Sequence, residues 1–117
     1  MKSKIKEIKE KKEIVFTYRE LVDYQTQSIV SSQLLDRDTG NVTVFAFDQG
    51  QKLSEHTAPC DALVQVVEGK GMFTVRGKEY ILSAGQGLIM PADLPHAVRA
   101  EERFKMVLVM IRSGDGK

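Results

Sequence analysis

The most constraining feature of this 117-residue sequence is the close spacing of its turn signals from Ser28 onward. Gly, Pro, Asn and Asp recur every several residues, and the segments between them are rich in Val, Ile, Leu, Phe and Thr. Turn residues at this spacing leave room for short strands but not for long amphipathic helices. The sequence therefore predicts an all-β sandwich or barrel built from eight or nine short strands.

The predicted strands are separated by glycine and proline turns. We expect tight turns at Gly69-Lys70-Gly71 and Arg76-Gly77-Lys78, and a loop bracketed by Pro91 and Pro95, because proline cannot donate to a β ladder. The segments with strand character are 28–36, 41–48, 63–68, 72–76, 79–82, 87–90, 96–100 and 104–112.

Composition divides the chain into a charged N-terminal arm (1–27), one β domain (28–112) and a loose C-terminal tail (113–117). Residues 2–13 are mostly Lys and Glu, which predicts a solvated terminus; an arm that pairs with another subunit is the alternative. The segment Thr17-Tyr18-Arg19-Glu20 has the form of a capping box and predicts one short helical turn, the only helix that we expect.

The charge balance gives no general reason to expect nucleic acid or a membrane as a partner. The chain carries 17 basic and 16 acidic residues, a formal net charge of +1. No apolar run approaches the roughly 20 residues that span a bilayer, and no secretory signal is visible. A single cysteine, Cys60, cannot form an internal disulfide, which fits a reducing compartment. We therefore expect a cytoplasmic protein.

Two predicted strands are apolar on both faces. In Phe104–Ile111 only Lys105 interrupts the apolar character, and in Val42–Phe47 only Thr43 does. A strand with one solvated face should alternate between polar and apolar residues. This pattern predicts a homodimer in which a second chain covers one face; a strand central to a closed sandwich is the alternative.

Both histidines of the chain lie in the middle of the β region, each after a glycine turn. His56 follows Gly50 by six residues and precedes an apolar run that ends at Gly69. His96 closes the segment Gly85–His96, with Pro91 between the glycine and the histidine. We expect two strands to carry the two imidazoles to one place.

These two segments, in this order, resemble the two sequence motifs of the cupin superfamily. The resemblance covers roughly residues 41–111 and implies a double-stranded β-helix, or jelly-roll barrel, with a pocket inside. The family's usual metal site uses two histidines and a glutamate from the first motif and one histidine from the second. Carried over residue by residue, the outer ligands are His56 and His96, whereas Ala58 and Ala62 occupy the other two ligand positions. Asp93 stands where the proline turn usually has glycine.

Two imidazoles can form an open metal site when other groups complete the coordination sphere. Asp61, beside the vacant glutamate position, is the leading third candidate, and Cys60, Glu55 and Gln65 are also near in sequence. If Ala62 points inward, Gln65 points outward unless a bulge intervenes. A divalent transition metal (Zn, Fe, Ni or Mn) held by His56, His96 and Asp61 is one hypothesis. Two neutral histidines that serve a ligand pocket without metal are the other.

The large apolar residues are expected to form the core, and some of them line the pocket. Such a pocket suits a small, partly hydrophobic ligand. No catalytic residue can be assigned from the sequence. The pocket candidates are Phe45, Phe47, Cys60, Met90 and Met106.

Three functions remain open at this point. The first is a small stand-alone cupin that binds a divalent metal, a small organic ligand or both through His56 and His96. The second is a metal-dependent dioxygenase or isomerase that acts on a small organic substrate. The third is a non-catalytic ligand-sensing or structural cupin whose metal site is lost. Cupin folds host many activities, so the site has to decide between them.

Overall fold

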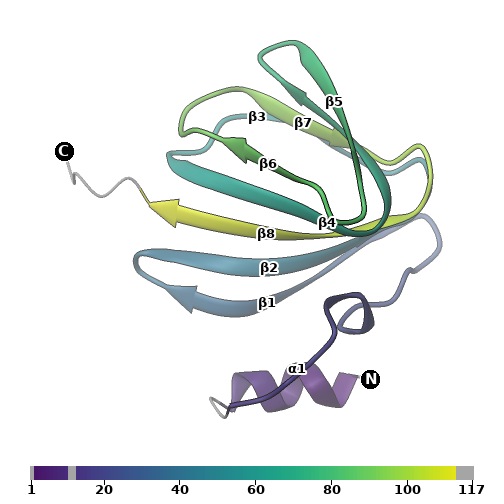
Figure 1. The fold of residues 1–117 in the computed structure, drawn as a ribbon, viewed down its shortest axis with the longest axis vertical. Helices are drawn as coiled ribbons and strands as arrows, with labels where there is room; N and C mark the ends of the chain where they lie inside the picture. Colours follow the sequence, from purple (N-terminus) through teal and green to yellow (C-terminus); the bar gives the residue numbers. More distant parts are fainter. Residues whose placement is uncertain (1, 11–12, 113–117) are drawn as a thin grey trace.

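The computed structural model describes residues 2–10 and 13–112, and it confirms the predicted all-β jelly-roll architecture (Figure 1). The predicted tail at 113–117 lies outside the described residues. The strands are β1 (Ile29–Arg37), β2 (Gly40–Phe47), β3 (Lys52–His56), β4 (Cys60–Val75), β5 (Lys78–Ser83), β6 (Gly87–Met90), β7 (His96–Arg99) and β8 (Phe104–Arg112). The helices are α1 (Lys2–Lys9) and the short 3₁₀ helix η1 (Tyr18–Glu20).

The strands form two antiparallel sheets that share β4. The first half of β4 pairs with β8 and β6, in a sheet ordered β1-β2-β8-β4-β6. Its second half pairs with β7 and β5, in a sheet ordered β3-β7-β4-β5. The hydrogen-bonded path therefore folds back on itself at β4, so that β8 faces β7 and β2 faces β3 across the interior (Figure 1).

The sequence predicts a tight turn at Gly69–Gly71, and this prediction is wrong. The chain continues through these glycines as one 16-residue strand that passes from the first sheet to the second. Gly69 has a φ of 77°, and a Cβ at Gly71 would lie 2.6 Å from the ring of Phe104. The glycines permit a close crossing of β4 over β8, rather than a reversal of the chain.

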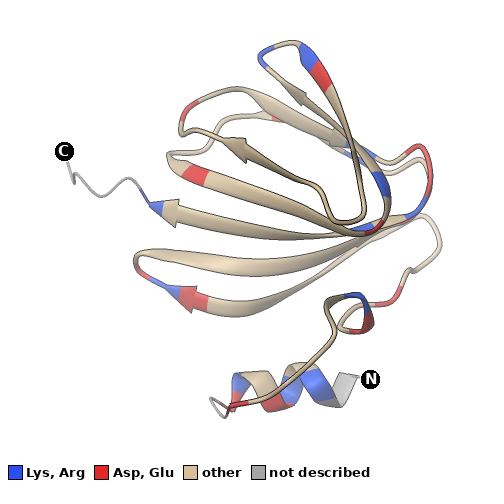
Figure 2. Ribbon diagram, viewed as in Figure 1, with Lys and Arg blue, Asp and Glu red and all other residues tan. Residues whose placement is uncertain are grey.

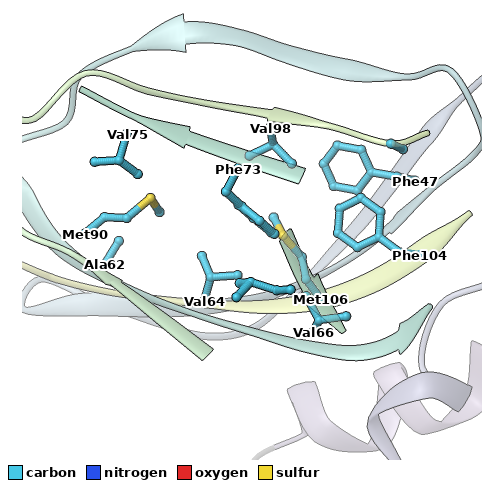
Figure 3. Close-up of a cluster of buried hydrophobic side chains, with 12 residues drawn as sticks. Phe47, Ala62, Val64, Val66, Phe73, Val75, Met90, Val98, Phe104 and Met106 are labelled. Carbon is cyan, nitrogen blue, oxygen red and sulfur yellow. The ribbon is translucent and has the colours of Figure 1, made fainter. Parts of the chain in front are cut away.

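The interior between the sheets is filled by apolar side chains from both (Figure 3). The rings of Phe47 and Phe104 stack with centroids 4.7 Å apart, and Phe73 meets Phe104 edge to face. Ala62, Val64 and Val66 all point inward from β4, whereas Gln65 is exposed, as strand alternation predicts.

The outer face of the first sheet is covered by the N-terminal part of the same chain. Leu21 and Val22 are both 3% exposed and belong to one apolar cluster with Val44 and Val107. Helix α1, which the sequence did not predict, packs against this cluster through its two isoleucines, Ile5 and Ile8. The apolar second face of β2 and β8 thus has an intrachain partner, and it does not require a second subunit. The homodimer stays a prediction, which a monomer mass in light scattering at micromolar concentration would remove.

A polar network ties this segment to the sheet. Tyr24 donates a hydrogen bond of 2.6 Å to Glu68, and Lys105, 7% exposed, donates one of 2.6 Å to the carbonyl of Arg19. Burial, together with the hydrogen bond to Glu68, raises the pKa of Tyr24 well above its ordinary value. Arg103 binds Asp48 at 2.8 Å, and Figure 2 shows that most other charged residues lie at strand ends, in turns and on the N-terminal segment.

Within residues 2–10 and 13–112, no helix combines the length and the apolar character needed to cross a bilayer.

Candidate functional site

The two histidines are cross-strand partners, which confirms that strands bring both imidazoles to one place. His56 ends β3 and lies opposite His96, the first residue of β7. Their ring centroids are 4.3 Å apart, with the ring planes inclined at 65°. His96 is half-buried and His56 is exposed, so the pair lies at the open end of the barrel interior.

A β-bulge aims His56 at the interior. Leu53 pairs with Val98 and His56 pairs with His96, so three steps along β3 match two steps along β7. In a regular strand, residues three apart point to opposite faces; the extra residue restores His56 to the face of Leu53. Val98 on that face is 4% exposed and belongs to the barrel core. The imidazole pair therefore faces inward.

Both imidazoles are held by the same local contact. Nδ1 of His56 lies 2.7 Å from the carbonyl oxygen of Ser54, and Nδ1 of His96 lies 2.9 Å from that of Leu94. A carbonyl can only accept, so each Nδ1 carries the proton. In the neutral ring, Nε2 is then an acceptor with a free lone pair. Two such acceptors stand side by side.

The walls around the pair are apolar. On the histidine side, Val75 is the cross-strand neighbour of His96. Ala62 and Met90 pair with each other on the opposite sheet, and they lie across from Val75 (Figure 3). We call this end of the interior, bounded by these three residues and the two histidines, the barrel mouth. Two surface hollows of about 610 and 310 Å³ lie elsewhere, and neither is lined by a histidine.

The donor set for a metal ion is incomplete. The two vacant ligand positions are Ala58 and Ala62, and Ala62 points into the barrel mouth. Among the described residues, no group of three or more His, Cys, Asp and Glu side chains could hold a metal ion. Stable divalent sites usually have three or four protein ligands. The residues present offer two imidazole nitrogens, so at least one protein ligand of a usual divalent site is missing.

The structure does not bring Asp61 to the histidines. Asp61 follows the inward Cys60 position and precedes the inward Ala62, so its side chain points to the outer face, where it is exposed. Its Oδ1 accepts a hydrogen bond of 2.9 Å from the amide of Ala92. Cys60 is a half-buried free thiol at the beginning of β4, on the inward side. Glu55 lies exposed in the bulge of β3.

The predicted pocket residues divide between core and interior wall. Phe47 and Met106 are at most 1% exposed, so they are core side chains, whereas Met90, 3% exposed, is a wall of the barrel mouth. Phe45 is half-buried and packs against the core from β2. The sequence did not mark Asn41, Thr43 or Met110 as site residues, but the register places all three on the inner face, because Asn41 pairs with Met110 and Met110 with Ala62.

Comparison with known proteins gives a consistent picture. A model of the Cupin domain family matches residues 43–112. A conserved protein of unknown function from Streptococcus pyogenes has a TM-score of 0.82 and 33% identity, over 86% of this chain and 88% of its own. The Cupin 2 conserved barrel domain protein from Leptotrichia buccalis has a TM-score of 0.79 and 42% identity, over 80% of this chain and 46% of its own.

One curated protein, polyketide synthase CurC of Streptomyces cyaneus, is 38% identical over 61 residues, which is 50% of this chain. The match spans 40% of the length of that relative.

Proposed function

The chain belongs to the cupin domain family, and from this premise we propose that it binds a small, partly apolar organic ligand in the barrel mouth through His56 and His96. One observation carries the proposal: two inward imidazoles, 4.3 Å apart, whose Nδ1 atoms are each committed to a backbone carbonyl. The two Nε2 atoms remain as paired acceptors. They suit a ligand that presents a hydroxyl group, such as a phenol or an enol.

The apolar walls define the rest of the ligand. Val75, Ala62 and Met90 surround the imidazoles with aliphatic and thioether surface, against which a ring or a short chain can pack. In this surrounding, a hydrogen bond from a ligand hydroxyl to Nε2 is less exposed to competition from water. The same geometry lets a neutral imidazole accept a proton from that hydroxyl.

A divalent metal would be held by the same two nitrogens, and it would act there as a Lewis acid toward a bound oxygen. Two protein donors make this a weak site, so we assign the primary role to the organic ligand. The metal-dependent dioxygenase and isomerase hypotheses stay predictions.

The test compares phenol with anisole, its methyl ether, which lacks the hydroxyl donor. In chemical-shift titrations of the folded protein, phenol should have a dissociation constant about three- to tenfold lower than that of anisole. This ratio corresponds to the net free energy of one hydrogen bond. His96→Phe keeps an aromatic ring but removes the acceptor, and His56→Phe does the same; both should reduce this preference. Thr74→Val, on the outer face of the same sheet, is the control and should keep it. Equal binding of phenol and anisole by the unmodified protein would contradict the proposal.

A further inference from the structure

The inner face of β2 carries polar side chains near its beginning, where the neighbouring barrel interior is apolar. Asn41 lies on this face because it pairs with Met110, which pairs with Ala62. Thr43 lies on the same face because its row continues through Leu108 to the buried Val64. Neither the metal nor the ligand hypothesis derived from the histidines uses these residues. Their place inside the barrel gives them a ligand-facing position.

The strand order puts this polar patch across the interior from the histidines. β2 faces β3, which carries His56, and β8 faces β7, which carries His96. Along the strands, Asn41 belongs to the same cross-strand row as Met110, Ala62 and Met90. Ala62 and Met90 of that row lie across the barrel mouth from Val75, the neighbour of His96 (Figure 3). A ligand that binds the imidazoles and extends over Met110 would reach Asn41.

The two ends of this path have opposite hydrogen-bonding character. Thr43 donates a long hydrogen bond of 3.5 Å to Oδ1 of Asn41, which leaves both N–H groups of the Asn41 amide free to donate. The imidazole end offers acceptors, so one end of the path receives a hydroxyl and the other receives a carbonyl. Facing sheets lie about 10 Å apart, so a ligand that joins the two ends has to span roughly one ring.

No buried charged side chain of the described residues lines this path. The buried charged side chains of the described residues are Asp48 and Lys105. Asp48 follows the far end of β2, and Lys105 points to the outer face of β8, where it contacts the N-terminal segment. Asp36 is the cross-strand partner of Asn41, but its side chain is exposed at the end of β1. The other charged residues near the mouth are exposed as well: Glu55, Asp61, Lys78 and Arg112. A charged ligand inside the barrel would have no buried counterion, which disfavours it.

We propose that Asn41, oriented by Thr43, is a specificity-determining residue of the barrel mouth. The ligand class that it selects is an uncharged hydroxy-carbonyl compound about one ring wide. Its hydroxyl binds the imidazoles of His56 and His96, and its carbonyl accepts from the Asn41 amide. This inference rests on the proposed function, because the imidazoles fix the first end of the ligand.

The test uses 4-hydroxyacetophenone, which carries both groups across one ring, and 4-ethylphenol, which lacks the carbonyl. In the unmodified protein, chemical-shift titration should give 4-hydroxyacetophenone the tighter dissociation constant, by about three- to tenfold. Asn41→Leu, of similar size, should abolish this difference and leave the binding of 4-ethylphenol within about twofold. Asn41→Asp keeps the size but removes the donors, and it should have the same effect. Gln65→Leu, on the outer face of β4, is the control.

The outcomes separate the two proposals. If both phenols bind equally well, or if the advantage of the ketone survives in both Asn41 variants, the role of Asn41 is wrong while the histidine site stands. If neither compound binds at concentrations up to about 10 mM, both proposals are wrong, since even so small a ligand should reach millimolar affinity in a formed site. A melting temperature unchanged from that of the unmodified protein shows that each variant is folded.

Discussion

His56 and His96 are cross-strand neighbours whose ring centroids lie 4.3 Å apart, although 39 residues lie between them in the sequence. The same contact fixes each ring, since each Nδ1 meets the carbonyl oxygen of the residue two positions earlier. The pair therefore offers two acceptors at the open end of the barrel.

The alanine at position 62 should be what keeps metal affinity low. Ala62→Glu adds a carboxylate on the inner face beside Met90, and with the two histidines it makes a three-donor set. We expect Zn²⁺ affinity to rise at least about tenfold by isothermal calorimetry. Gln65→Glu places the same charge on the outer face of the same strand and should leave affinity unchanged. An equal rise in both variants would mean that bulk charge, and not the histidine pair, attracts the ion.

Deletion of Glu55 should preserve the histidine pair. The bulge has one residue more on β3 than on β7 between the pairs Leu53–Val98 and His56–His96. Without Glu55 the two pairs fit a regular ladder, and the histidine still faces inward. We expect the preference for phenol over anisole to change by less than about twofold. Loss of the preference in a variant that still unfolds cooperatively would show that the bulge itself shapes the site.

The N-terminal segment should contribute strongly to stability. Leu21 is 3% exposed in the cluster that covers the outer face of the first sheet, whereas Val15 is 91% exposed. Leu21→Ala should lower the free energy of unfolding by about 2–4 kcal/mol in urea denaturation, because it leaves a cavity. Val15→Ala should change it by less than about 0.5 kcal/mol. Similar small effects in both variants would mean that the segment is not docked on the sheet in solution.

Acid should remove a contact between the N-terminal segment and the barrel. The hydrogen bond from Arg103, followed by that from the amide of Gln27, holds the pKa of Asp48 below its ordinary value. A lowered pKa in the folded state means that the carboxylate stabilises the fold above about pH 4 and that this contribution is lost as the pH falls through the folded-state pKa. Asp48→Asn should be less stable than the unmodified protein at pH 7, and the gap should close below about pH 4.

The control for this titration is Asp38→Asn, an exposed turn residue. Its difference from the unmodified protein should stay small at every pH. If the stability difference between Asp48→Asn and the unmodified protein persists unchanged down to about pH 2, the effect comes from side-chain shape and not from charge.

The sequence predicted the parts of the fold that depend on local patterns. With Ala62 inward, as the resemblance implies, alternation predicted that Val64 and Val66 also point inward, and they do. Asp93, which replaces the usual glycine of the proline turn, lies in the left-handed region at a φ of 69°. Asp tolerates this region better than most residues, so the turn survives the replacement. These features are set by residues close together in the chain.

The features that sequence reasoning missed depend on contacts between distant segments. Gly69 and Gly71 look like a turn, but they are glycine because Arg103 and Phe104 approach the backbone of β4. The apolar outer faces of β2 and β8 suggested that a second subunit covers them. The N-terminal arm was not recognised as the cover, because Ile5 and Ile8 are the only large apolar residues in its mostly charged beginning, residues 2–13. The bulge in β3 leaves no mark in the sequence. If the same residues were paired in a regular ladder, with none deleted, His56 would point outward.

The paired-acceptor site is tested most directly by finding which nitrogen of each imidazole carries the proton, with long-range ¹H–¹⁵N correlation spectra of the folded protein at neutral pH. The structure predicts that both rings carry their proton on Nδ1 and that added phenol shifts the Nε2 resonances of both. Rings protonated on Nε2, or a response to phenol from only one histidine, would contradict a paired-acceptor site in the barrel mouth.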